Sequence, residues 1–196
     1  MDELSEELAK PHNARLRAYV AGLFDIERNK RWVDCSHSIG VHHFWSVSTL
    51  QHLGSLDARL IKDDIEVAKT GYPKTPTFEL GDHITASYLW VLGMYELVRT
   101  LDQFAKQEES PLNNVSAEIN SYKRRINRLR IPLAKMEAAG SNRDDSPIAY
   151  PGVNQDHGMA WQLGEDTWIT RRELSDEALA LFEFIDSQKK EETESR

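Results

Sequence analysis

The chain has 196 residues, of which 40% are hydrophobic and 29% charged, and its net charge is −8. This balance is typical of a globular protein, and a chain of this length buries about 70% of its unfolded surface in one core. We therefore expect a single domain over residues 1–187 and a disordered charged tail over residues 188–196. Cys35 is the only cysteine, so an intramolecular disulfide and a CxxC motif are excluded.

The sequence also predicts where the protein resides. Residues 1–7 are acidic, whereas a secretory or mitochondrial presequence begins with basic residues. The longest uncharged stretch, residues 84–95, is far shorter than the ~20 residues that span a bilayer. We expect a cytoplasmic protein that makes no contact with a membrane.

In chain order, apolar positions at helical spacing predict a first helix over residues 12–29. Residues 32–53 fit neither the helical nor the strand period, and we interpret the first half of this stretch as irregular. A second helix follows Ser55 and ends at Gly71, and it begins earlier, near Ser48, if Gly54 is tolerated inside it.

Residues 71–81 form a loop rich in Gly and Pro, after which Asp82 is the expected cap of a long helix over residues 83–106. Apolar residues cover most of the circumference of this helix. A helix that is apolar nearly all round is a buried one, so this segment should be the centre of the core.

The clearest pattern in the chain is a heptad repeat that follows the helix-start signals Ser110 and Pro111. Pro132 lies inside the repeat, where it removes one helical hydrogen bond, and we predict a kink there rather than an end. The apolar positions of the repeat are Leu112, Val115, Ile119, Tyr122, Ile126, Leu129, Leu133 and Met136.

Residues 139–155 are predicted to be a loop, residues 158–171 a β-hairpin, and Ser175 the cap of a last helix. The expected fold class is therefore mainly α: a helical bundle of about five helices with a small C-terminal β-hairpin.

Several histidines near the only cysteine contain ligand atoms that suit zinc or another transition metal. Structural zinc sites space their ligands as CxxC or HxxxH, and the residues here do not follow such spacing. We therefore predict no metal site, and whether His37, His42 and His43 bind anything stays open. The residues of this cluster are Cys35, His37, His42, His43 and His52.

Arg31 and His37 form a second candidate site near the end of a predicted helix. Helical ribonucleases of the HEPN type carry an Arg and a His at such a spacing. One or two pairs of this kind are expected by chance in a chain with seven His, so the pair does not establish a family resemblance. In a cleavage site, His37 would act as acid or base and Arg31 would stabilise phosphate charge.

A basic run on the heptad helix is the third candidate, and it is a binding site. Without these six charges the net charge of −8 would be −14, so positive charge is concentrated on one helix. The favoured interpretation is that they pair with acidic groups of the same fold, and binding of phosphate or an acidic partner is the alternative. The six residues are Lys123, Arg124, Arg125, Arg128, Arg130 and Lys135.

No GxGxxG, GxxxxGK[ST], GxSxG or HExxH motif occurs, and we name no cofactor. The sequence therefore predicts a non-catalytic helical binding or regulatory protein that self-associates or binds a protein partner. The first alternative is a HEPN-like ribonuclease or other nucleic-acid-acting enzyme that holds its substrate through residues 123–135. The second is a metal-dependent helical enzyme.

Overall fold

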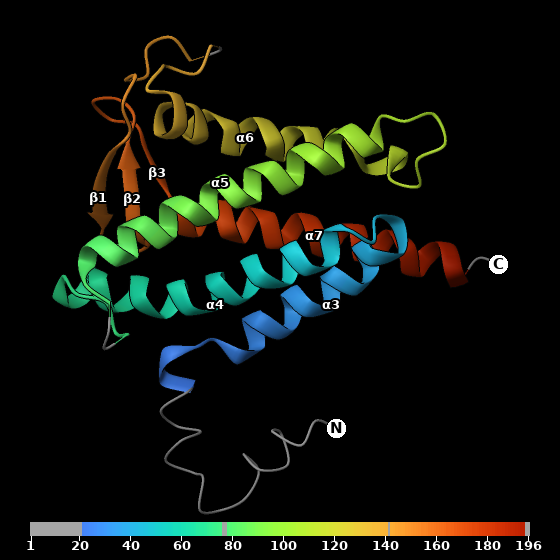
Figure 1. Ribbon diagram of the computed structural model, residues 1–196, viewed down its shortest axis with the longest axis horizontal. Coiled ribbons are helices and arrows are strands. Elements are labelled where there is room, and N and C mark those ends of the chain that lie inside the picture. The colour runs from blue at the N-terminus through green and yellow to red at the C-terminus, as the bar shows by residue number, and fades with distance from the viewer. Residues whose placement is uncertain (1–20, 76–77, 141, 195–196) are drawn as a thin grey trace, which may run out of the picture.

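The structure is a computed structural model that describes residues 21–75, 78–140 and 142–194 (Figure 1). Helices form most of this part, and a small sheet precedes the last helix. The elements, in chain order, are α3 (Ile26–His42), α4 (Ser46–Thr70), α5 (Leu80–Ala105), the 3-10 helix η2 (Asn113–Val115), α6 (Ser116–Lys135), β1 (Tyr150–Asn154), β2 (Gly158–Gln162), β3 (Trp168–Thr170) and α7 (Arg171–Glu194).

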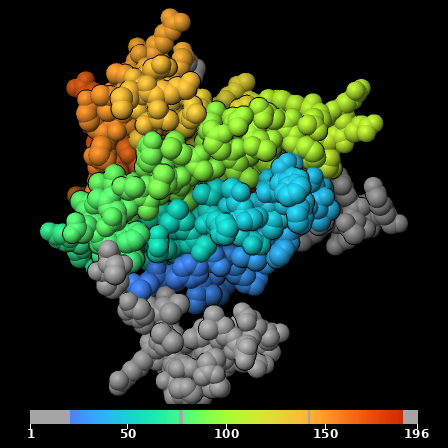
Figure 2. All heavy atoms as spheres, viewed as in Figure 1, coloured from blue at the N-terminus to red at the C-terminus, as the bar shows by residue number. Residues whose placement is uncertain are grey.

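The helices pack as a bundle that α7 closes. α3 packs against α4, α4 against α5 and α5 against α6, while α7 contacts both α3 and α6. Figure 2 shows α5, α4 and α3 as consecutive bands across one face. The described residues contain five α-helices and a small antiparallel sheet, so the predicted mainly α fold is confirmed. None of the helices in these residues has the length and apolar character needed to span a bilayer.

α5 lies at the centre of the core, as its apolar circumference predicts. Trp90, Val91, Met94 and Val98 on this helix are fully buried. α5 begins at Leu80, a little before the expected start, because the side chains of Glu79 and Asp82 form a capping box at its N-terminus.

The heptad repeat packs inside the fold rather than on its surface. Its positions from Leu112 to Leu129 are buried, and they belong to the same core as α5 and α7. α6 continues through Pro132, as predicted, and ends at Lys135. The prediction that the apolar stripe includes Met136 is wrong: Met136 adopts a left-handed conformation with φ 55 and is 75% exposed.

α3 occupies much of the stretch that we predicted to be irregular, so that prediction is wrong. It starts at Ile26 because the Asp25 carboxylate accepts a hydrogen bond from the Arg28 amide at 3.0 Å. Its buried face contains Cys35, Ser36 and Ser38 between Trp32 and Ile39, and these weakly apolar residues conceal the helical period. The predicted helix over residues 12–29 is interrupted at residues 24–25, and its residues 12–20 lie outside the described ranges.

Gly54 lies inside α4 because this position must accommodate the indole of Trp32. A Cβ at Gly54 would overlap the Trp32 side chain, so the missing side chain allows α3 and α4 to approach closely. α4 starts at Ser46 and ends at Thr70, and the next residue, Gly71, caps it with a φ of 80, the left-handed conformation expected of a glycine at this position.

The predicted hairpin exists as β2 and β3, and β1 adds a third antiparallel strand in the order β1-β2-β3. The prediction of a loop over residues 139–155 is therefore wrong at its end, where Pro151 and Gly152 lie in an edge strand, the position at which a sheet tolerates such residues.

The last helix starts earlier than we predicted. Ser175 is not its cap, because the Thr170 hydroxyl accepts from the Glu173 amide at 3.1 Å and the Glu173 carboxylate accepts from the Thr170 amide at 3.2 Å. This capping box starts α7 at Arg171. The helix then extends to Glu194, past residue 187, where the sequence placed the end of the domain.

Candidate functional site

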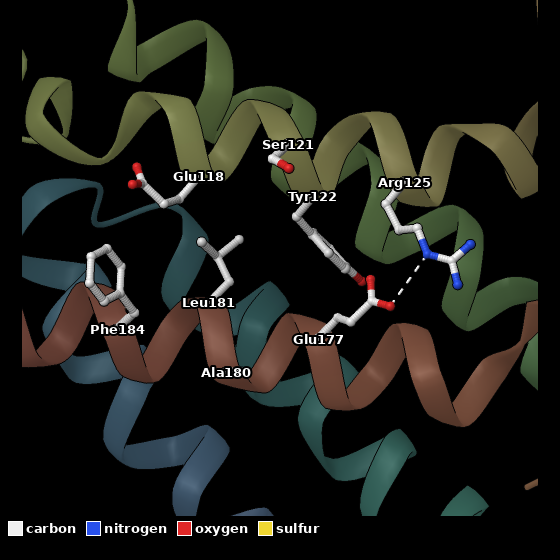
Figure 3. A pocket seen from close by; sticks show the side chains of 8 residues that line it. All are labelled: Glu118, Ser121, Tyr122, Arg125, Glu177, Ala180, Leu181 and Phe184. Carbon is white, nitrogen blue, oxygen red and sulfur yellow. Dashed lines mark hydrogen bonds and ion pairs between the residues drawn. The ribbon is translucent and has the colours of Figure 1, made fainter. Parts of the chain in front are cut away.

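A groove of about 500 Å³ runs between α6 and α7, and the predicted basic helix forms one of its walls (Figure 3). The two helices run antiparallel along it. Its lining residues are Glu118, Ser121, Tyr122 and Arg125 from α6, and Glu177, Ala180, Leu181 and Phe184 from α7.

Tyr122 ties the two walls together at the bottom of the groove. Its hydroxyl donates a hydrogen bond to the Leu174 carbonyl at 2.8 Å, and the side chain is buried. Burial, and then the negative charge of Glu177, raise the pKa of this hydroxyl well above its ordinary value. Tyr122 therefore acts as a fixed hydrogen-bond donor rather than as an acid.

The groove is apolar along α7, from Ala180 and Leu181 to Phe184 at the end beside Glu118 (Figure 3). Leu181 is 8% exposed and Phe184 is 40% exposed, which is a large fraction for an aromatic side chain. Ala180 is exposed beside them, and its small side chain leaves the floor open to solvent. The groove thus presents apolar surface to water along α7.

Opposite charges lie at the two ends of the groove. At one end, Arg125 Nε lies 3.3 Å from Glu177 Oε1, and the terminal nitrogens of the guanidinium make no ion pair with another described residue. At the other end, the exposed Glu118 lies above Phe184 and makes no ion pair with any described residue (Figure 3).

Most cations of the predicted basic helix contact acidic groups of the same chain. Lys123 Nζ lies 2.5 Å from Asp102 Oδ2, and Arg128 donates two hydrogen bonds to Asp145, at 2.7 and 2.8 Å. Arg130 lies 3.7 Å from Glu96 and over the Tyr95 ring. Arg124 and Lys135 are exposed, and neither has an ion pair within the described ranges.

Asp102 is the acid that these cations affect most. Burial alone would raise its pKa, but hydrogen bonds from Lys106, Lys123 and Asn120 outweigh burial and lower the pKa to about 2. The carboxylate is therefore ionised under all ordinary conditions and anchors α6 to α5.

The structure does not bring Arg31 and His37 together. Both lie on α3, six positions apart, so they project from different sides of the helix. Arg31 donates two hydrogen bonds to the Glu183 carboxylate on α7, at 2.6 and 2.9 Å, while His37 is exposed. Phosphate could reach Arg31 only in competition with Glu183.

The residues of the histidine cluster are also dispersed. Burial, and then the charges of Glu183 and Asp186, raise the pKa of the Cys35 thiol to about 12, which leaves it an inert thiol. His43 Nδ1 lies 2.7 Å from the Ser46 hydroxyl at the turn between α3 and α4, and His52 is exposed on α4. In the part of the chain that the structure describes, no three His, Cys, Asp or Glu residues lie close enough to hold a metal ion.

A buried ionic cluster that the sequence did not reveal joins α3, α4, α5 and α7. Arg171 is fully buried and contacts Asp57 and Asp64, which lie seven positions apart on the buried face of α4. Asp64 also accepts from His83 Nε2 at 2.9 Å, and Arg28 Nε lies 2.6 Å from Asp57. The spacing of the two acids within an apolar stripe is a signal that could have revealed them, since buried carboxylates require cations.

His157, in the turn between β1 and β2, lies beside the cap of α7. Its Nδ1 is 3.4 Å from the Thr170 hydroxyl and 3.8 Å from Glu173 Oε1. Thr170 is nearly fully buried and already engaged in the capping box, so this group is better suited to fixing the start of α7 than to nucleophilic chemistry.

Comparison with known proteins adds no family to these observations, because no family model, curated protein or solved structure matches this chain.

Proposed function

We propose that this protein is a non-catalytic helical binding protein that associates with a second copy of itself through the α6–α7 groove. The observation that carries the proposal is the order of groups along the groove: at one end the Glu118 carboxylate, which has no ion pair among the described residues, then an apolar stretch, and at the other end the Arg125 guanidinium, whose Nε contacts Glu177 (Figure 3). When a second copy of the groove runs in the opposite direction, the carboxylate of each copy lies opposite the guanidinium of the other.

A two-fold axis that lies in the interface, perpendicular to the helices, produces this match. It places α6 of one copy antiparallel to α6 of the other, because both copies present the same surface. Glu118 of each copy then faces Arg125 of the partner, and the two Leu181 side chains meet near the axis. The opposed charges fix the register while burial of Phe184 and its neighbours supplies affinity.

Two further observations support a binding role rather than a catalytic one. The Cys35 thiol is buried with a raised pKa, and the Arg31 guanidinium already binds Glu183. Asp57 and Asp64, two carboxylates whose pKa values the neighbouring cations lower, are enclosed in the core, where no substrate reaches them. The apolar groove between α6 and α7, in contrast, is open to solvent.

Sedimentation over a range of protein concentrations tests the proposal. A groove of this size makes a small interface, so we expect a monomer–dimer equilibrium with a dissociation constant of roughly 1–100 µM. Phe184→Ser should weaken the dimer at least tenfold. The control is Phe44→Ser, which removes a phenylalanine outside the groove that is more exposed than Phe184, at 72% against 40%, and should leave the equilibrium unchanged.

The charge pattern allows a sharper test by mixing variants. Glu118→Lys and Arg125→Glu should each weaken self-association, because each places like charges opposite one another. An equimolar mixture of the two variants should form a heterodimer, since both charge pairs are then complementary again. Glu109→Lys, an exposed acid outside the groove, makes the same charge change and should have no effect.

A monomeric mass at all concentrations would refute the proposal. A dimer that is insensitive to Phe184→Ser and to Glu118→Lys would refute the assigned interface. Circular dichroism of each variant shows whether the chain is still folded, and so separates loss of the dimer from unfolding.

A further inference from the structure

A second cavity lies on α4 and shares no lining residue with the α6–α7 groove. It has a volume of about 410 Å³ and is lined by Phe24, His52, Ser55, Leu56 and Arg59. The four α4 residues follow the spacing i, i+3, i+4 and i+7, so they project from one face of the helix. This face combines a guanidinium, an imidazole and a hydroxyl with an apolar wall.

Arg59 is the unusual member of this group. Its guanidinium lies 4.5 Å above the Phe78 ring, which holds the side chain in place. Its Nε atom is buried and has no hydrogen-bond partner, and the side chain makes no ion pair with the described residues. The buried or partly buried guanidiniums of Arg28, Arg128 and Arg171 all contact carboxylates.

The buried Nε is closed to a ligand, because an atom that water cannot touch is also out of reach of a phosphate oxygen, so the donors that a ligand can meet are the two terminal nitrogens. In a chain with a net charge of −8, acidic side chains are abundant, yet none of those described contacts Arg59. The guanidinium is therefore held in position by the Phe78 ring without an acidic partner among the described residues.

We propose that this cavity binds a small phosphate monoester whose organic part is apolar. Arg59 presents a fork of donors to two phosphate oxygens, and Ser55 and His52 lie one and two turns away on the same face for the remaining oxygens. The organic part lies against Phe24 and Leu56. A volume of about 410 Å³ suits a small ligand, since ligand pockets typically occupy about 300–1,000 Å³.

This site is independent of the proposed self-association, because it uses a different face and no residue of the α6–α7 groove. Isothermal titration with phenyl phosphate, inorganic phosphate, benzoate and phenol tests it. We expect phenyl phosphate to bind at least tenfold more tightly than inorganic phosphate or benzoate, and phenol not to bind. Phenol lacks the anion, inorganic phosphate lacks the apolar part, and benzoate offers fewer oxygens.

Two variants locate the binding site. Arg59→Gln should abolish binding of phenyl phosphate, whereas Arg124→Gln, which removes an exposed arginine of α6 with no ion pair among the described residues, should leave it unchanged. Ser55→Ala should weaken binding several-fold without lowering the melting temperature, because Ser55 is exposed and alanine favours helix. This second variant keeps the test informative if Arg59→Gln loosens the fold by releasing Phe78.

The proposal is overturned if phenyl phosphate does not bind at millimolar concentration, or if Arg59→Gln and Ser55→Ala both bind it as well as the unaltered protein. If inorganic phosphate binds as tightly as phenyl phosphate, the cavity does not recognise an apolar group. If benzoate binds more tightly than phenyl phosphate, the cavity recognises a carboxylate rather than a phosphate. Either result contradicts the ligand class assigned to this cavity.

Discussion

The guanidinium of Arg171 donates from Nη1 to Asp57 Oδ1 at 2.5 Å, and neither side chain is exposed to solvent. This ion pair connects the first residue of α7 to the middle of α4. Arg28 contacts the other oxygen of Asp57, and Asp64 takes the second terminal nitrogen of Arg171, so two guanidiniums balance two carboxylates. Burial disfavours both ionised acids, but the cations outweigh burial and lower the pKa values of Asp57 and Asp64.

The first prediction concerns the stability that depends on this cluster. Arg171→Met should lower the free energy of unfolding by about 3–5 kcal/mol, because it leaves two buried carboxylates without their shared cation. Urea denaturation at neutral pH measures the loss. The control is Arg172→Met at the next position, which is partly exposed and lies 3.9 Å from Asp176. This control should change the free energy of unfolding by less than about 1 kcal/mol. Similar losses of stability in both variants would contradict a dominant role of the buried ion pairs.

The second prediction uses the low pKa of Asp102. Its folded-state pKa of about 2 lies below the ~3.9 of an unfolded aspartate, so its contribution is present above about pH 4 and is lost as the pH falls towards 2. Asp102→Asn should therefore be less stable than the unaltered protein at pH 7, by on the order of 2 kcal/mol. The difference should shrink steadily between pH 4 and pH 2 in urea midpoints. A difference that is constant with pH would contradict the ionic origin.

The sequence predicted the helices where apolar residues repeat clearly and failed where polar residues fill buried positions. α5 and α6 were found because their buried faces consist of large apolar side chains. α3 was missed in part because Ser36 and Ser38 are buried there, satisfied by hydrogen bonds to Val33 and Asp186. The start of α7 was missed because Thr170 and Glu173 form a capping box that the β-prone residues before it obscured.

The candidate site was less accessible from the sequence than the fold. The basic run identified α6 correctly as a charged helix, yet a linear pattern does not reveal that Asp102 and Asp145 lie opposite it. The groove forms only where α7 packs beside α6, and α7 is remote from α6 in the sequence. The contribution of Phe184 to the groove therefore cannot be recognised before the fold is known. Tertiary contacts of this kind depend on the topology of the chain rather than on the local spacing of apolar residues.

The third prediction concerns the close approach of α3 and α4. Gly54→Ala should destabilise the protein by about 1–3 kcal/mol, because the added methyl group overlaps Trp32, although alanine is the better helix former. Gly81→Ala in α5 is the matched control. Nothing lies within 4 Å of a Cβ there, so this change should be neutral or stabilise by up to about 1 kcal/mol. Thermal denaturation of both variants compares the signs, and a stable Gly54→Ala variant would show that the two helices can separate.

The last prediction decides whether the cations of α6 serve the fold or a nucleic acid. Arg128 forms a two-pronged ion pair with the nearly buried Asp145, whereas Arg124 is exposed and has no ion pair among the described residues.

If the cations serve the fold, Arg128→Gln should lower the free energy of unfolding by about 1–3 kcal/mol, because it leaves the Asp145 carboxylate without its donors. Arg124→Gln makes the same chemical change and should have almost no effect. The triple change of Arg124, Arg125 and Arg128 to Gln should then lower the melting temperature, and neither RNA nor DNA should bind the unaltered protein even at low salt. Fluorescence anisotropy with labelled oligonucleotides measures the binding. Micromolar binding that weakens steeply with salt and is lost in the triple variant would mean that phosphates outcompete Asp145 for these arginines, because each neutralised phosphate releases counterions. That result would favour a nucleic-acid-acting protein over the binding protein proposed above.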